Sequence, residues 1–158
     1  MDAETYKYNS VTVAKFIVAY AHKECITINM TKLQKLLYIA YGLYLAVKNS
    51  RLLNEHPQAW PYGPVFPTTR NKLLKLDLTT ISLDDPEFRD LKEDKEIESL
   101  LNLIFKSFGK LSASQLSEWS HQSGSPWEET VSSPEFNWGK RIDDDIIRSY
   151  FSKMIEHE

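Results

Sequence analysis

The feature that most constrains the fold is a set of apolar residues spaced three and four apart between residues 31 and 47. They would cover one wide face of a single α-helix: Leu33, Leu36, Leu37, Ala40, Leu43, Tyr44 and Val47. The pattern therefore predicts a buried central helix. Thr31 and Gln34 have the spacing of a capping box that would begin it. Gly42 in its interior costs about 1 kcal/mol relative to Ala, which indicates close approach of another backbone at that position.

The same spacing of three and four recurs along most of the chain and predicts helices there, because in a strand the apolar residues would recur at every second position. The predicted helices and turns cover residues 10–24, 31–47, 67–75, 94–109, 112–122, 125–127 and 143–154. Short polar side chains at Ser10, Asp94, Ser112 and Asp143 would cap four of these helices. The expected fold is all-α, with at most minor β: a compact multi-helix single domain over residues 1–158, with its core at about 10–155.

Residues 51–67 break the helical pattern with four prolines, one glycine and three aromatic residues. Proline removes a backbone donor and fixes φ, so this stretch suits neither a helix nor a central strand. Its aromatic side chains can pin it to the body, and we expect an ordered loop rich in Pro and aromatic residues. Pro67 suits the first turn of the next helix. Residues 77–94 are acidic and irregular, which predicts a mobile connection with an extended piece near 79–83 and a turn at Asp85 and Pro86.

Charge is unevenly distributed along the chain. The net charge is −3, but residues 1–80 hold 10 Lys and Arg against 5 Asp and Glu (+5), and residues 81–158 hold 9 against 17 (−8). A protein partner or docking within the molecule is the simplest use of such a split. A nucleic-acid-binding transcriptional regulator is the alternative, if the second and third helices form one basic face from Lys32, Lys35, Arg70, Lys72 and Lys75.

Composition argues against several other classes. Cys25 is the single cysteine and cannot form an intramolecular disulfide, and one Cys with four scattered His does not supply a structural zinc site. The acidic runs at 84–87 and 143–145 lack the spacing of a calcium loop. We therefore expect no metal and no cofactor. A reducing, cytoplasmic location is also expected, since neither a signal peptide nor a membrane span is visible.

Candidate catalytic groups are few. His22 and Cys25 would share a face if the first helix continued past residue 24, giving a base beside a thiol. His121 lies among several serines, but without the Gly-x-Ser-x-Gly pattern of a nucleophile elbow. Neither set includes a third group or an oxyanion donor, so the sequence favours a protein that is not an enzyme. A hydrolase using Cys25 or His121 is the third hypothesis.

Three motifs in order along the chain resemble the Panacea antitoxin domain, the family of SocA-like and phage-associated GepA-like proteins. They are Lys32-Leu33-Gln34-Lys35-Leu36-Leu37-Tyr38, then Trp60-x-Tyr62-Gly63-Pro64-Val65, then Leu116 with His121 and Gly124-Ser125-Pro126-Trp127. The resemblance spans about residues 10–155. It implies a mainly helical domain that neutralises a neighbouring toxin by direct protein contact, although some relatives deliver the toxin to a cellular protease.

The resemblance and the basic third helix together suggest a partner-binding set. Its members are Lys35, Tyr38, Trp60, Tyr62, Gly63, Pro64, Val65, Arg70, His121 and Trp127. By their own chemistry most of these residues equally suit a rigid scaffold. Tyr62 differs, because an aromatic residue beside Gly63 and Pro64 could serve as the anchor type that is enriched at the energetic centre of interfaces. The oligomeric state and the identity of the toxin are left open.

Overall fold

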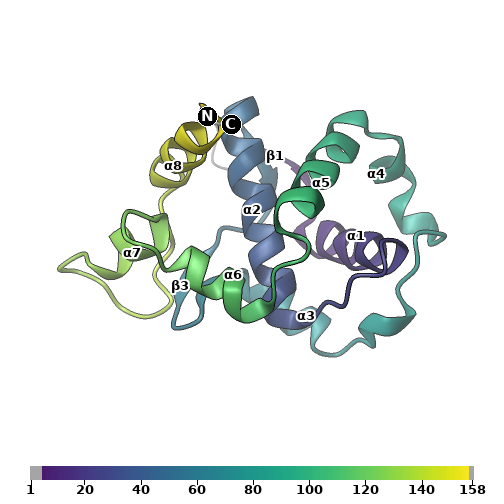
Figure 1. The fold of residues 1–158 in the computed structure, drawn as a ribbon, viewed down its shortest axis with the longest axis horizontal. Coiled ribbons are helices and arrows are strands. Elements are labelled where there is room, and N and C mark those ends of the chain that lie inside the picture. The colour runs from purple at the N-terminus through teal and green to yellow at the C-terminus, as the bar shows by residue number, and fades with distance from the viewer. Residues whose placement is uncertain (1–4, 157–158) are drawn as a thin grey trace.

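Helix α2 (Met30–Lys48) runs through the middle of the molecule, with other helices packed on both sides of it (Figure 1). The computed structural model describes residues 5–156 of the chain. Every residue from Lys32 to Leu45 is buried. The predicted central helix is thus confirmed, and its burial extends around the whole helix because α1, α5, α6, α8 and two strands surround it.

The described residues are mainly helical, as the sequence predicted. The other α-helices are α1 (Ser10–Lys23), α3 (Pro67–Leu73), α4 (Arg89–Glu93), α5 (Lys95–Phe108), α6 (Ala113–Ser120), α7 (Pro126–Val131) and α8 (Asp144–Glu156). The strands are β1 (Tyr6–Tyr8), β2 (Arg51–Leu53), β3 (Gln58–Trp60) and β4 (Gly63–Val65). Helices α1, α4 and α5 lie on one side of α2, and α7 and α8 lie on the other (Figure 1). No helix among these residues is long and apolar enough to cross a membrane.

Helix caps agree with the sequence in the second half of the chain and differ in the first. Asp94 caps α5, and Ser112 forms the predicted capping box with α6. The first two helices are instead capped by asparagines one or two residues upstream of the predicted Ser10 and Thr31: Asn9 accepts from the backbone at the start of α1, and Asn29 accepts from the Lys32 amide. Asparagine and serine cap about equally well, so sequence preference alone does not choose between neighbours.

The predicted loop at 51–67 contains short strands. Strand β2 pairs in parallel with β1, in the register Tyr6↔Arg51 and Tyr8↔Leu53. Strands β3 and β4 form an antiparallel hairpin that turns through Pro61 and Tyr62. Pro64 is tolerated because the hairpin is narrow and β4 lies at its edge. The prediction of an ordered segment followed by a helix from Pro67 is confirmed, with minor β as expected.

The acidic segment 77–94 contains short helical pieces joined by the irregular residues 81–85, and a turn begins at Pro86 as predicted. It contains the 3₁₀ turns η1 (Leu78–Thr80) and η2 (Pro86–Phe88) and then α4. The predicted extended piece near 79–83 is therefore wrong over its first residues. Phe88 and Leu91 are buried in the core, and the Phe88 ring packs 5.4 Å from that of Phe16 on α1. Leu78, Ile81 and Leu83 are partly buried against the same core and add to this anchoring.

Candidate partner-binding surface

The three motifs, which are far apart in the sequence, meet at the N-terminal half of α2. Lys35 on α2 donates a hydrogen bond to the Pro64 carbonyl of β4 at 3.1 Å. Trp127 on α7 donates through Nε1 to the Trp60 carbonyl of β3 at 2.7 Å. The β3–β4 hairpin is therefore held by both α2 and α7, while Tyr62 in its turn is exposed.

Lys35 lies under the hairpin and is only 1% exposed. Burial lowers the pKa of its ammonium group to about 8, because the charged form loses hydration. Gly63 lies directly above it with φ of 114°, a conformation that favours glycine. A Cβ at Gly63 would come within 2.6 Å of Ser120 Oγ and 2.7 Å of Lys35 Cε. Only glycine lets the hairpin sit this close to α2 and α6.

His121 ends α6, which is the helix C-terminal position the sequence suggested. Its ring lies 4.0 Å from the Trp127 ring, and its Nε2 is buried with no hydrogen-bond partner among residues 5–156. Burial lowers the pKa of His121, and the nearby charge of Lys35 lowers it further. A hydrogen bond with the Pro61 backbone partly offsets these two effects on the pKa. The neutral form of the ring is therefore favoured, and it contacts the Trp127 ring at an interplanar angle of 44°.

The serines near His121 are engaged in local structure. The Ser120 hydroxyl donates to the Ser117 carbonyl at 2.8 Å, and the Ser125 hydroxyl donates to the Ser120 carbonyl at 2.9 Å. Both hydroxyls thereby hold the turn between α6 and α7. Neither is hydrogen-bonded to the imidazole, so the arrangement lacks the nucleophile–base contact that the hydrolase hypothesis requires.

His22 and Cys25 do not form a catalytic pair. Helix α1 ends at Lys23, and Cys25 follows in a left-handed conformation with φ of 57°. The sequence expectation required the helix to continue, and it does not. The Cys25 side chain is exposed, whereas Nδ1 of His22 lies 3.1 Å from the Ile81 carbonyl. Among the described residues, no three His, Cys, Asp or Glu side chains are grouped so that they could hold a metal ion.

Exposure divides the expected partner-binding set into two groups. The buried members, which cannot touch a partner in this conformation, are Lys35, Tyr38, Gly63, Pro64 and Val65. Trp60, Arg70, His121 and Trp127 are partly exposed, and the Arg70 guanidinium lies 5.4 Å from the centre of the Trp60 ring. Tyr62 is 72% exposed at the turn of the hairpin. The set thus consists of an exposed aromatic tip and the residues that support it.

The structure contradicts the basic face on which the nucleic-acid alternative depended. Lys32 is buried and donates through Nζ to the Gly109 carbonyl at 2.6 Å. Lys35 is buried under the hairpin, and Arg70 stacks on Trp60. Helix α3 packs on α1, not beside the Lys32 face of α2. Two of the five cations are therefore unavailable to phosphates, and the basic face is reduced to Arg70, Lys72 and Lys75.

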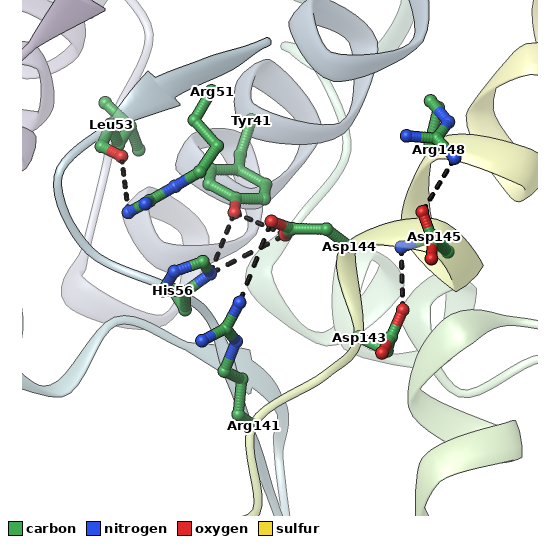
Figure 2. A network of polar contacts seen from close by, with 9 residues as sticks. All are labelled: Tyr41, Arg51, Leu53, His56, Arg141, Asp143, Asp144, Asp145 and Arg148. Atoms are coloured by element: carbon green, nitrogen blue, oxygen red, sulfur yellow. Dashed lines mark hydrogen bonds and ion pairs between the residues drawn. The ribbon is translucent and has the colours of Figure 1, made fainter. Parts of the chain in front are cut away.

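A polar network, which sequence reasoning missed, ties the base of the hairpin to α8 (Figure 2). The Tyr41 hydroxyl on α2 donates to Oδ1 of Asp144 at 2.5 Å. Nδ1 of His56, between β2 and β3, lies 3.1 Å from Tyr41 Oη and 3.6 Å from Asp144 Oδ1. Although burial raises the pKa of Asp144, hydrogen bonds from His56 and Tyr41 lower it below its usual value. Asp144 lies in the acidic run at 143–145, and acidic residues at a helix start are common because they interact favourably with the helix dipole, so the run itself does not indicate this network.

Comparisons with known proteins agree with the convergence of the motifs. Residues 33–128 match the family model described as Antitoxin SocA-like, Panacea domain. The chain is also similar to the protein named Antitoxin SocA of Caulobacter vibrioides (strain NA1000 / CB15N), with 33% identity over 156 residues, covering 88% of this chain and 80% of that protein. No solved structure matches significantly. Apart from Lys32, the three motifs lie within the matched range.

Proposed function

Because the chain belongs to the antitoxin SocA-like, Panacea domain family, we propose that it is the antitoxin of a toxin–antitoxin pair and neutralises its toxin by direct protein–protein contact. It makes and breaks no bond in doing so. We place its action in the cytoplasm, where the single exposed thiol of Cys25 would stay reduced. In this proposal, inhibition requires only the toxin and this chain, and a cellular protease is not needed.

The observation that supports direct binding is the exposed Tyr62 on a hairpin that is fixed from two sides. A tyrosine has only two rotatable side-chain bonds and a large contact area, so it loses little entropy when it is immobilised in an interface. The hairpin adds to this advantage, because Lys35 and Trp127 hold its backbone before the partner arrives. We assign Tyr62 as the central anchor, with Trp60, Arg70 and Trp127 around it.

The buried members of the set have a supporting role in this proposal. Tyr38 packs edge-on against Phe151 of α8 at 5.5 Å and lies 6.4 Å from Trp119 of α6. It therefore fixes the helices on which the hairpin rests. Lys35, Gly63, Pro64 and Val65 set the height and angle of the turn. Changing them would alter binding through the position of Tyr62.

The test uses the protein encoded beside this chain as the toxin. Cells expressing that protein should stop growing, and coexpression of this chain should restore growth. Tyr62→Ala should weaken the purified complex about 30-fold, the effect of losing an anchor worth about 2 kcal/mol, with no change in thermal unfolding. Val47→Ala is the matched control, because Val47 is 65% exposed at the far end of α2.

Two results would contradict the proposal. A neighbouring protein that is harmless alone leaves no toxin to neutralise. A toxin that stays active in a purified mixture with this chain, but disappears from cells when the chain and a protease are both present, would show delivery for degradation instead of inhibition by contact. The purified inhibition assay and the measurement of toxin half-life in protease-deficient cells therefore separate the two modes.

A further inference from the structure

Trp138 is a large aromatic residue that is 59% exposed in the loop between α7 and α8. It lies outside the three motifs and beyond the range matched by the family model. Folded proteins usually cover most of a tryptophan side chain, because its apolar area is large. An outward-facing tryptophan on an ordered segment is therefore a candidate contact residue.

Backbone pairing fixes the residues after Trp138 beside the hairpin. Gln58 on β3 forms an antiparallel bridge with Arg141. The Ala59 amide donates to the Lys140 carbonyl at 2.8 Å, and the Gly139 amide donates to the Ala59 carbonyl at 2.9 Å. These bonds make residues 139–141 a third strand-like segment along the free edge of β3. Trp138 directly precedes Gly139, in a turn closed by the Lys140 amide and the Asn137 carbonyl, so it lies beside the end of β3 that leads to Tyr62.

Ring contacts connect Trp138 to the proposed surface. Its ring lies 6.3 Å from that of Trp127 and packs edge-on against Phe136 at 4.9 Å. Trp127 is itself bound to the Trp60 carbonyl. One side of the Trp138 ring is thus supported by aromatic neighbours while the rest stays open, which is the arrangement of an anchor that is oriented before binding.

We infer that Trp138 is a second anchor of the surface centred on Tyr62, and that it contributes to the choice of toxin. This inference rests on the proposed function. Because Trp138 is exposed and lies outside the range matched by the family model, a different residue at this position would leave the hydrogen bonds that hold the hairpin in place. Arg70 over Trp60 and the exposed Lys140 place positive charge around the aromatic residues. The matching toxin surface therefore has an apolar recess for each ring, with acidic groups opposite Arg70 and Lys140 and basic groups opposite Glu128, Glu129 and Glu135.

The experiment measures the affinity of the purified toxin for the wild-type chain, Trp138→Ala, Tyr62→Ala, the double variant and the control Val47→Ala. Trp138→Ala should weaken binding at least 10-fold, and the double variant should bind more weakly than either single variant. Trp138→Phe should recover part of the affinity. Lys140→Gln should slow association at low salt and have little effect at high salt. Thermal unfolding of each variant checks that the fold is intact, as is expected for an outward-facing ring.

The outcomes separate this inference from the proposed function. If Tyr62→Ala weakens the complex and Trp138→Ala does not, Trp138 is not a second anchor, and the antitoxin proposal stands. If the wild-type chain does not bind the toxin at all, the proposed function itself fails. If Trp138→Ala changes the oligomeric state of the free chain but leaves toxin affinity unchanged, Trp138 belongs to an interface between copies, which also overturns the inference.

Discussion

The ring of Phe151 on α8 fills the place that a side chain at Gly42 of α2 would take. An added Cβ at Gly42 would lie 2.2 Å from two carbons of that ring, far inside van der Waals contact. Both residues are fully or nearly fully buried. The close approach predicted from this glycine is therefore real, but it involves an aromatic side chain and not another backbone. It lets α8 lie against the middle of α2.

Gly42→Ala is expected to destabilise the protein by about 1–3 kcal/mol, the usual cost of overpacking a core. The better helix propensity of Ala recovers about 1 kcal/mol at most. Urea unfolding followed by circular dichroism measures the change. In a Phe151→Leu background the same substitution should cost much less, because the smaller side chain leaves room for the methyl group. Equal costs in both backgrounds would show that the ring is not the obstacle.

Lys35 gives a second prediction, which concerns pH. Its pKa is about 8 when folded, against about 10.4 for an unfolded lysine. Between these values the unfolded chain binds more protons, so the contribution of Lys35 to the free energy of unfolding rises with pH. Relative to Lys35→Met, the wild type should gain about 1–2 kcal/mol between pH 8 and 9.5.

The measurement is a set of urea unfolding curves at several pH values for both proteins. Lys72→Met is the matched control, because Lys72 is exposed on α3. The difference in unfolding free energy between Lys72→Met and the wild type should be the same at every pH measured. If the difference in unfolding free energy between Lys35→Met and the wild type is also independent of pH, the ammonium group is hydrated in solution and the hairpin does not seal it from water.

Local chemistry made much of the helical fold predictable. Asp94 at the start of α5 and the pair Ser112 and Gln115 at the start of α6 satisfy exposed amides within a few residues, so their roles can be deduced from spacing alone. Gln34 shows the limit. It has capping-box spacing to Thr31, but its Oε1 accepts from the Phe66 amide at 2.8 Å, 32 residues away. The Gln34 side chain therefore bonds to a distant backbone amide and not to the helix start that its spacing predicted.

The motif order brings candidate residues together but does not predict which of them are buried. The motif order identifies Lys35, Tyr62 and Trp127, but burial depends on tertiary contacts, and Lys35 is inside while Tyr62 is outside. Trp138 and the link from Tyr41 to Asp144 carry no short sequence pattern. Both depend on residues 139–144 returning to the hairpin, a pairing across about 80 residues that only the folded chain displays.

Asp94 is expected to contribute to stability in two ways. Its Oδ1 accepts from the Glu96 and Ile97 amides of α5, and its Oδ2 accepts from the Tyr8 hydroxyl at 2.7 Å and the Lys7 ammonium at 3.0 Å. Asp94→Ala removes both sets and should cost about 2–3 kcal/mol, whereas Asp94→Asn keeps the cap and should cost less. Asp84→Ala, at an exposed position, should have almost no effect.

The Asp94 prediction also has a pH dependence. Burial raises the pKa of this carboxyl, but the hydrogen bonds from Tyr8 and Lys7 outweigh it and lower the pKa below its usual value. A lowered folded pKa means that the carboxylate stabilises the fold fully above the unfolded pKa of about 3.9 and progressively less as the pH falls through the folded value. The difference in unfolding free energy between wild type and Asp94→Asn should therefore be constant near pH 7 and shrink below about pH 4. A difference that persists at lower pH would point to packing as its cause.

Trp127→Phe tests whether the side of the hairpin is held by a specific hydrogen bond. The phenyl ring can still stack on His121, but it cannot donate to the Trp60 carbonyl. We expect a loss of about 1 kcal/mol in stability, typical of a single hydrogen bond, and a weaker complex with the toxin because Tyr62 is less well positioned. Trp119→Phe removes a similar volume from the α6–α8 contact, away from the hairpin, and should lower stability without a matching loss of toxin affinity. Equal losses of affinity in the two variants would mean that general loosening of the core, not the position of the hairpin, governs binding.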